Sequence, residues 1–213
     1  MENTHKRMLV LGATGKTGTE IIDLALARGH EVTAFVRSPT KITRRDPRLT
    51  VVKGDPKSAE QLFAILPGHD VVLSALGPRP KEALTRTTVL KECAASAVVA
   101  MKRAGVRRFL IVSSAMLFPG GGPLIAFLRF LLRAHVRDLD AMEEIVKAAG
   151  IDWTIARPPR LVPAADESYR AQPSGLPTGG NLFSVLSWRA VAAFMLDSAE
   201  RGLYQREVVG ICR

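Results

Sequence analysis

The stretch Gly12-Ala-Thr-Gly15-Lys-Thr-Gly18 follows an apolar run, Met8-Leu-Val-Leu11, and precedes residues with helical spacing. It is a GxxGxxG pattern at a strand-to-helix junction. We expect Gly12 to allow a tight turn, Gly15 to let the backbone approach a pyrophosphate, and Gly18 to let the helix pack closely. The helix N-terminus would then offer free N–H groups to the phosphates. The stretch therefore predicts dinucleotide binding, and a purely structural glycine turn is the alternative.

The predicted phosphate-binding residues of this turn are Gly12, Thr14, Gly15, Lys16, Thr17 and Gly18. Gly15-Lys16-Thr17 also matches the end of a nucleoside triphosphate phosphate loop. That motif requires a glycine five residues before Gly15, and this position holds Val10, inside the apolar run. The spacing therefore excludes the triphosphate alternative.

Short apolar runs alternate with helical periods along the whole chain. The expected strands are residues 8–11, 31–36, 49–52, 70–75, 108–112, 152–156 and 207–211. The expected helices are residues 17–28, 86–103, 138–149 and 187–199. Runs that are apolar on both faces suit a parallel sheet covered on both sides. We therefore predict a Rossmann-like, doubly wound, mostly parallel α/β sheet of six to seven strands in three α/β/α layers.

Residues 1–213 are predicted to form a single NAD(P)-binding domain. Residues 158–186 are rich in proline and glycine and show little periodicity. We expect them to form a substrate-side loop, because long irregular segments in compact domains usually border a binding site. A second irregular piece, residues 118–123, follows the fifth strand and could border the same site.

The composition is that of a globular protein with a strong basic excess. Of 213 residues, 47% are hydrophobic and 23% charged, and the formal net charge is +10. Such a charge favours a phosphorylated cofactor, a nucleic acid or an anionic membrane surface. No recognisable nucleic-acid-binding motif is present, so nucleic acid is an unlikely partner. Two cysteines without a CxxC pattern argue against a disulfide scaffold or a zinc site, and we expect no metal.

The first residues contain no apolar signal segment, so we expect a cytoplasmic protein. The longest apolar stretch, residues 124–132, is interrupted by Arg129 and is too short to span a membrane. We expect it to form a helix beside the substrate entrance. A helix that binds a membrane surface or a partner is the alternative. A monomer is compatible with the sequence, which leaves the oligomeric state open.

The end of the second strand indicates which dinucleotide binds. NAD sites usually carry an acidic residue there, which accepts a hydrogen bond from the ribose 2′-OH. Here the strand ends in Arg37-Ser38. A guanidinium cannot accept that bond but suits a 2′-phosphate, so Arg37 and Ser38 predict NADP(H).

The motifs together resemble the atypical short-chain dehydrogenase/reductases. They are most similar to the NAD(P)-binding group of NmrA-like and biliverdin-IXβ/flavin reductase-like proteins. The match includes the turn at 12–18, residues 31–37, 52–55, 74–77, 101–106, 112–115 and 153–159. The resemblance implies that Asp55 and Pro56 border the adenine, and that Ala75, Leu76 and Gly77 border the ribose and pyrophosphate. It also implies that Ser113 and Ser114 lie near the nicotinamide, walled by Pro158, Pro159 and Arg160.

The usual proton donor of the wider superfamily, a Tyr-x-x-x-Lys pair, is missing. The two tyrosines, Tyr169 and Tyr204, are followed four residues later by proline and valine. The related biliverdin/flavin reductases carry a histidine in the segment where this chain has Arg160, which cannot shuttle protons but could bind an anionic acceptor. The candidate catalytic residues are Ser113, Ser114 and Arg160.

Two functions remain open from the sequence. The first is an NADPH-dependent reductase that transfers hydride to a small planar acceptor, flavin- or quinone-like, which needs little general-acid help. The second is a non-catalytic NADP(H)-binding redox sensor that signals to a partner.

Overall fold

The computed structural model describes residues 5–77 and 88–213. In this part of the chain eight strands form one sheet in the order β3-β2-β1-β4-β5-β6-β10-β8. The seven parallel strands are β1 (Arg7–Leu11), β2 (Glu31–Val36), β3 (Leu49–Lys53), β4 (Val71–Ser74), β5 (Arg108–Val112), β6 (Asp152–Arg157) and β10 (Glu207–Cys212). Strand β8 (Arg170–Pro173) pairs antiparallel with β10 at the edge.

The strand order reverses at β1, which lies between β2 and β4. Leu11, at the end of β1, is opposite Phe35 of β2 and Ser74 of β4. The chain therefore leaves β1 and β4 in opposite lateral directions at the same edge of the sheet. In open α/β sheets this switch point opens a crevice at the carboxyl ends of the strands, where ligands bind.

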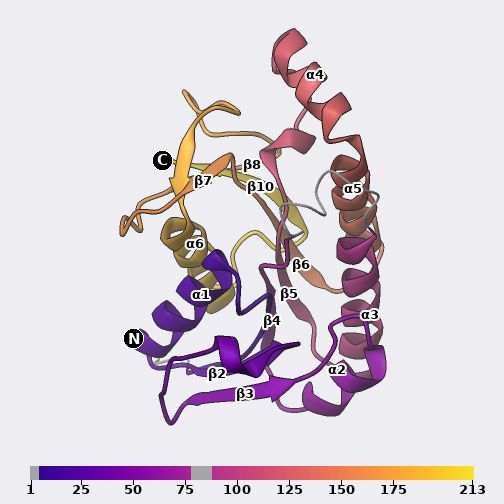
Figure 1. The fold of residues 1–213 in the computed structure, drawn as a ribbon, viewed down its shortest axis with the longest axis vertical. Helices are drawn as coiled ribbons and strands as arrows, with labels where there is room; N and C mark the ends of the chain where they lie inside the picture. Colours follow the sequence, from indigo (N-terminus) through magenta and orange to yellow (C-terminus); the bar gives the residue numbers. More distant parts are fainter. Residues whose placement is uncertain (1–4, 78–87) are drawn as a thin grey trace.

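Helices cover both faces of the sheet (Figure 1). One face carries α1 (Lys16–Ala27) and α6 (Trp188–Glu200), and the other carries α2 (Ala59–Ile65), α3 (Val89–Ala104) and α5 (Arg133–Lys147). Helix α4 (Gly122–Leu131) projects from the top of the molecule in Figure 1, beyond both layers. Two short 3-10 helices are η1 (Pro39–Lys41) and η2 (Ala115–Leu117).

The two cores divide the residues of β1 by strict alternation. Met8 and Val10 belong to the core under α1 and α6, whereas Leu9 and Leu11 belong to the core under α2, α3 and α5. Successive side chains of a strand point to opposite faces, so a strand with helices on both sides must be apolar at every position. This explains the uninterrupted apolar run that predicted the strand.

All seven predicted strands and the doubly wound α/β architecture are confirmed, and the sheet is one strand larger than predicted. The difference lies in residues 158–186, which we expected to be irregular. They contain β8 and a small parallel sheet of β7 (Arg160–Val162) and β9 (Val185–Ser187). These strands have three or four residues each, and β7 and β8 have no buried residue, so they carry little apolar alternation.

The helices differ from the predictions mainly in two respects. Helix α5 begins at Arg133 rather than residue 138, and α2 was not predicted. Residues 86 and 87 of the helix predicted over 86–103 lie outside the described residues, and α3 is described from Val89. Among the described helices, none is both long and apolar enough to cross a membrane.

Candidate functional site

The turn between β1 and α1 is tightly packed against the end of β4. Gly12 has a φ of +78°, and a Cβ there would lie 2.6 Å from the carbonyl carbon of Ala75. A Cβ at Gly18 would overlap the carbonyl oxygen of Gly12. The N–H of Gly15 closes the turn by donating to the Gly12 carbonyl at 2.9 Å. Two of the glycines are therefore required by close backbone contact, as predicted for this fold.

The N-terminus of α1 has free donors because no side chain caps it in the described structure. Gly15 is its N-cap residue. By contrast, Ser58 caps α2 and Ser187 caps α6, and Asp138 of α5 accepts from two N–H groups in the first turn of α3. The first N–H groups of an uncapped helix need an external acceptor and carry partial positive charge. The N-terminus of helix α1 can therefore bind a phosphate group at the switch point.

The residues of the turn differ in their exposure. Thr14, Gly15 and Lys16 face solvent, whereas Thr17 and Gly18 are buried. The Nζ atom of Lys16 lies 4.1 Å from the ring centre of Trp188, at the start of α6. This contact holds a positive charge beside the uncapped helix end.

Arg37 and Ser38 are exposed directly after β2, the strand next to β1. Three of the six basic side chains that follow it in residues 38–57 have acidic partners: Arg44 with Asp23, Arg48 with Asp46, and Lys57 with Glu92. Among the described residues no acidic side chain forms an ion pair with Arg37. Its guanidinium is therefore free to bind an added phosphate ester.

The other predicted cofactor residues surround the same edge of the sheet. The N–H of Ala75 donates to the carbonyl of Leu11 at 2.9 Å, so the segment 75–77 continues beside the turn; Leu76 is half-buried and Gly77 exposed. Asp55 is exposed, and its carboxylate accepts from the N–H of Lys57 at 3.0 Å, which orders the turn before α2. Pro56 is buried. Asp55 thus has a structural role in the turn, alongside its predicted position near the adenine.

Ser113 belongs to a buried polar cluster. Its hydroxyl donates to Oε1 of Glu143 at 2.6 Å, and Glu143 is fully buried. Arg157, at the end of β6, binds both oxygens of Glu143 at 2.9 and 2.6 Å, and Lys147 lies 3.3 Å away. Because a serine hydroxyl has a single proton to donate, that of Ser113 is committed to Glu143.

Ser114 has a different environment. It is half-buried, and its hydroxyl oxygen accepts from the N–H of Met116 at 3.2 Å, which caps η2. Accepting a hydrogen bond leaves the hydroxyl proton available. Of the two serines, Ser114 is the one that can still donate to a ligand.

Glu143 was not predicted from the sequence, although a signal was present. It lies on α5 next to Met142, four residues after Leu139 and three before Val146, so the apolar spacing of the helix places it on the inner side. A carboxylate at an inward position of an amphipathic helix requires a buried cationic partner. The complementary signal is Arg157, which follows the apolar pair Ile155-Ala156 at the end of β6.

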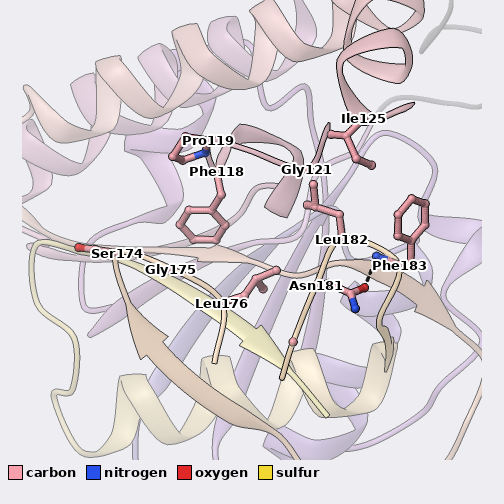
Figure 2. Close-up of a pocket in the computed structure, with 11 residues that line it drawn as sticks. Phe118, Pro119, Gly121, Ile125, Ser174, Gly175, Leu176, Asn181, Leu182 and Phe183 are labelled. Atoms are coloured by element: carbon pink, nitrogen blue, oxygen red, sulfur yellow. Dashed lines mark hydrogen bonds between the residues drawn. The ribbon is translucent and has the colours of Figure 1, made fainter. Parts of the chain in front are cut away.

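An apolar cavity of about 500 Å³ lies between the η2–α4 connection and the loop after β8 (Figure 2). Its lining carries no charged side chain among the described residues and comprises Phe118, Pro119, Gly121, Ile125, Ser174, Gly175, Leu176, Gly180, Asn181, Leu182 and Phe183. The guanidinium of Arg157 lies 4.7 Å from the ring centre of Phe118, so the buried cluster supports one wall. Arg129 holds the same wall by donating to the carbonyls of Met116, Phe118 and Gly120. The volume of the cavity is that of a small-molecule site.

The segment after β6 is tied to the end of β5. The carbonyl of Pro158 accepts from the N–H of Ala115 at 2.8 Å, with Pro158 buried and Pro159 half-buried. Arg160 is exposed at the first position of β7 and is not among the described residues that line the cavity. Neither tyrosine lines it: Tyr169 donates to Asp197 at 2.6 Å, and Tyr204 packs against Phe194.

The remaining reactive side chains are enclosed. Both cysteines are buried and free, and burial raises the pKa of Cys93 to about 11. His135 is half-buried, and burial lowers its pKa. Its Nδ1 has no partner within the described part of the chain. No group of three potential metal ligands occurs among the described residues.

A family model described as NAD(P)H-binding matches residues 12–201. The chain belongs to this family. The family predicted from the motifs is thereby confirmed, and NAD(P)H binding with it.

The similar proteins span several activities. The chain is 33% identical over 164 residues, 72% of its length, to an uncharacterized chloroplastic protein of Arabidopsis thaliana, and it spans 58% of that protein's length. It is 29% identical to an epimerase candidate of Bacteroides thetaiotaomicron, with a TM-score of 0.79 over 98% of this chain and 97% of that one. An NADH-flavin reductase candidate of Streptococcus pneumoniae is 20% identical, with a TM-score of 0.71 over 98% and 99%, and shares the fold.

Replacing Gly15 tests the approach of phosphate to the turn. Gly15→Ala keeps an ordinary φ, and its Cβ meets only the Gly12 carbonyl oxygen, at 3.2 Å. We expect the variant to fold with a loss of at most about 1 kcal/mol. It should bind NADPH at least about tenfold more weakly by calorimetry, because the methyl group occupies the phosphate's place. Gly12→Ala, by contrast, should lose both stability and binding. An unchanged NADPH affinity for Gly15→Ala would contradict the assignment.

Breaking the buried cluster should be costly. Arg157→Met leaves the Glu143 carboxylate buried with Ser113 and Lys147 only, and we expect a loss of about 3 kcal/mol in urea unfolding. The matched control is Arg107→Met, which removes an exposed ion pair with Asp152 and should cost less than about 1 kcal/mol. Equal losses for the two variants would show that the cluster does not stabilise the fold.

Proposed function

We propose that the protein is an NADPH-dependent reductase that transfers hydride to a small, planar, flavin- or quinone-like acceptor. The observation that carries the proposal is the position of the neutral cavity. Its wall begins at Phe118, four residues after Ser114, where the resemblance to related reductases places the nicotinamide. A dinucleotide that starts at the Gly12–Gly18 turn would end beside this cavity.

The preference for NADPH rests on Arg37. Its unpaired guanidinium follows β2 at the position where an NAD site carries an acidic residue. A guanidinium binds a phosphate ester through charge-assisted, bidentate hydrogen bonds, and it offers the free 2′-OH of NADH no acceptor.

The chemistry requires little from the side chains. NADPH, when bound, supplies the hydride. The chain orients the acceptor against Phe118 and Leu176 and offers the Ser114 hydroxyl as a hydrogen-bond donor. Ser113 acts as a positioning residue through Glu143 and Arg157. A reduced flavin or quinone takes its proton readily from solvent, so no tyrosine is needed.

The cavity lining also bears on the type of acceptor. Arg160, which we considered as a partner for an anionic group, lies at the exposed start of β7. A neutral, apolar lining favours an uncharged acceptor, because a phosphate or carboxylate placed there would be desolvated without a partner. Riboflavin and short-chain quinones therefore fit better than FMN.

Removing the Arg37 guanidinium tests the choice of cofactor. We expect Arg37→Ala to weaken NADPH by about 10- to 100-fold and to leave NADH unchanged, because only the 2′-phosphate contact is lost. The matched control is Arg45→Ala, an exposed arginine of the following loop with no ion pair among the described residues. Calorimetry with both coenzymes measures the effect, and equal losses would refute the NADP assignment.

An acceptor panel tests the reaction itself. We expect NADPH oxidation, followed by nicotinamide absorbance, with riboflavin or a short-chain quinone at a kcat/KM at least about tenfold above that for FMN. Phe118→Ala should raise KM for the acceptor, whereas Leu203→Ala, an exposed residue remote from the cavity lining, should change nothing. NADPH binding without turnover of any acceptor would support the redox-sensor alternative instead.

A further inference from the structure

Helix α4 is apolar on every side. Its sequence, GPLIAFLRFL, contains one charged residue, Arg129, and the guanidinium of that residue turns back to three carbonyls of the chain that precedes the helix. A helix without a polar face normally lies in a core. Helix α4 instead projects from the body of the molecule (Figure 1).

The outward side of α4 is exposed to a degree unusual for such residues. Leu124, Phe127, Phe130 and Leu131, here called the α4 face, are 57%, 61%, 64% and 55% exposed. Residues 124, 127 and 131 share one side of the helix by their i, i+3, i+7 spacing, and residue 130 adjoins them. Ile125 points the other way, is buried, and lines the cavity.

The apolar surface continues to the mouth of the cavity. Phe183, 60% exposed, lines the cavity on the same side as Ile125 (Figure 2). The described residues include seven large exposed hydrophobic side chains, and five of them belong to the α4 face or to Phe183. Isolated exposed apolar residues are ordinary, but a cluster beside a binding cavity marks an interaction surface.

The charges around the α4 face select its occupant. Arg133, at the start of α5, lies 5.0 Å from the ring centre of Phe130, and Arg137 is exposed one turn later. Residues 93–137 contain no acidic side chain. An apolar face with a basic rim matches an anionic bilayer surface, where aromatic and aliphatic side chains enter the interface and arginines meet lipid phosphates. Two copies of the chain would bring their basic rims together, which disfavours a dimer on this face.

We propose that the α4 face docks the protein on an anionic bilayer surface and that the cavity takes an uncharged, lipophilic acceptor from that bilayer. Ile125 and the α4 face lie on opposite sides of one short helix, so docking would place the cavity mouth at the lipid boundary. The docking proposal rests only on the exposed apolar residues of the α4 face and the arginines beside it. The delivery of the acceptor rests on the proposed function.

Vesicle binding tests the docking. We expect the full chain to co-sediment with phosphatidylcholine vesicles containing about one-third phosphatidylglycerol, and much less with pure phosphatidylcholine. Phe127→Ser combined with Phe130→Ser should weaken binding at least about tenfold. Val99→Ser combined with Leu203→Ser removes exposed apolar residues elsewhere and should have no effect. Arg133→Gln combined with Arg137→Gln should lower only the part of the binding that depends on phosphatidylglycerol.

Three results would overturn the docking. The first is no binding to anionic vesicles. The second is equal binding by the wild type and the Phe127→Ser/Phe130→Ser double variant, here called the α4 variant. The third is a wild-type dimer in sedimentation analysis that is absent from the α4 variant. Unfolding curves establish that the variants fold, and all the substituted side chains are exposed or at the surface of α5.

A second assay separates delivery from activity. With a long-chain quinone embedded in anionic vesicles, the α4 variant should lose reductase activity at least about tenfold relative to the wild type, and it should keep full activity on a water-soluble quinone. Equal rates on the embedded quinone would refute delivery while leaving the proposed reductase intact. No turnover of either quinone would refute the proposed function, and vesicle binding would still decide the docking.

Discussion

The contact between Gly12 and the backbone of Ala75 underlies the whole site. It joins the end of β1 to the end of β4 at the point where the strand order reverses, and no side chain would fit between the two segments. Because the turn is pressed against the sheet, the N-terminus of α1 is fixed in the crevice with its donors free. The site predicted for a charged, extended cofactor is thus built largely from backbone atoms.

The second constraint is the buried carboxylate of Glu143. It holds Ser113 at the end of β5 and Arg157 at the end of β6, and Arg157 in turn packs on Phe118. A charged group in the core would be unfavourable alone, but here each oxygen has a cationic partner. The cluster thereby fixes the position of the cavity wall relative to β5 and β6. Ser113, Glu143 and Arg157 can do this without contacting a substrate.

The sequence was sufficient for the architecture and for the tight glycine turn after β1, because both depend on local patterns. A strand covered on both sides must be apolar throughout, and a glycine with backbone on two sides cannot be replaced. The small strands β7, β8 and β9 follow from long-range pairing at an exposed edge, which leaves little pattern in the sequence. Glu143 was missed for another reason. Its inward position on α5 is a local signal, but the partner that its burial requires, Arg157, lies on another element, and no local pattern pairs the two.

Helix α4 shows the limit of hydrophobic pattern as evidence. Residues 124–132 predicted a helix beside the substrate entrance, and the structure has a helix, Gly122–Leu131, whose buried Ile125 lines the cavity. An apolar side chain in the sequence indicates only that it is more stable away from water. A protein core and a lipid bilayer both provide such an environment. The charges that border the helix distinguish these two environments. A core helix is bordered by paired charges, whereas α4 is followed by exposed Arg133 and Arg137, and residues 93–137 contain no acidic side chain. The charged residues that border an apolar segment therefore indicate whether its partner is a protein core or a lipid surface.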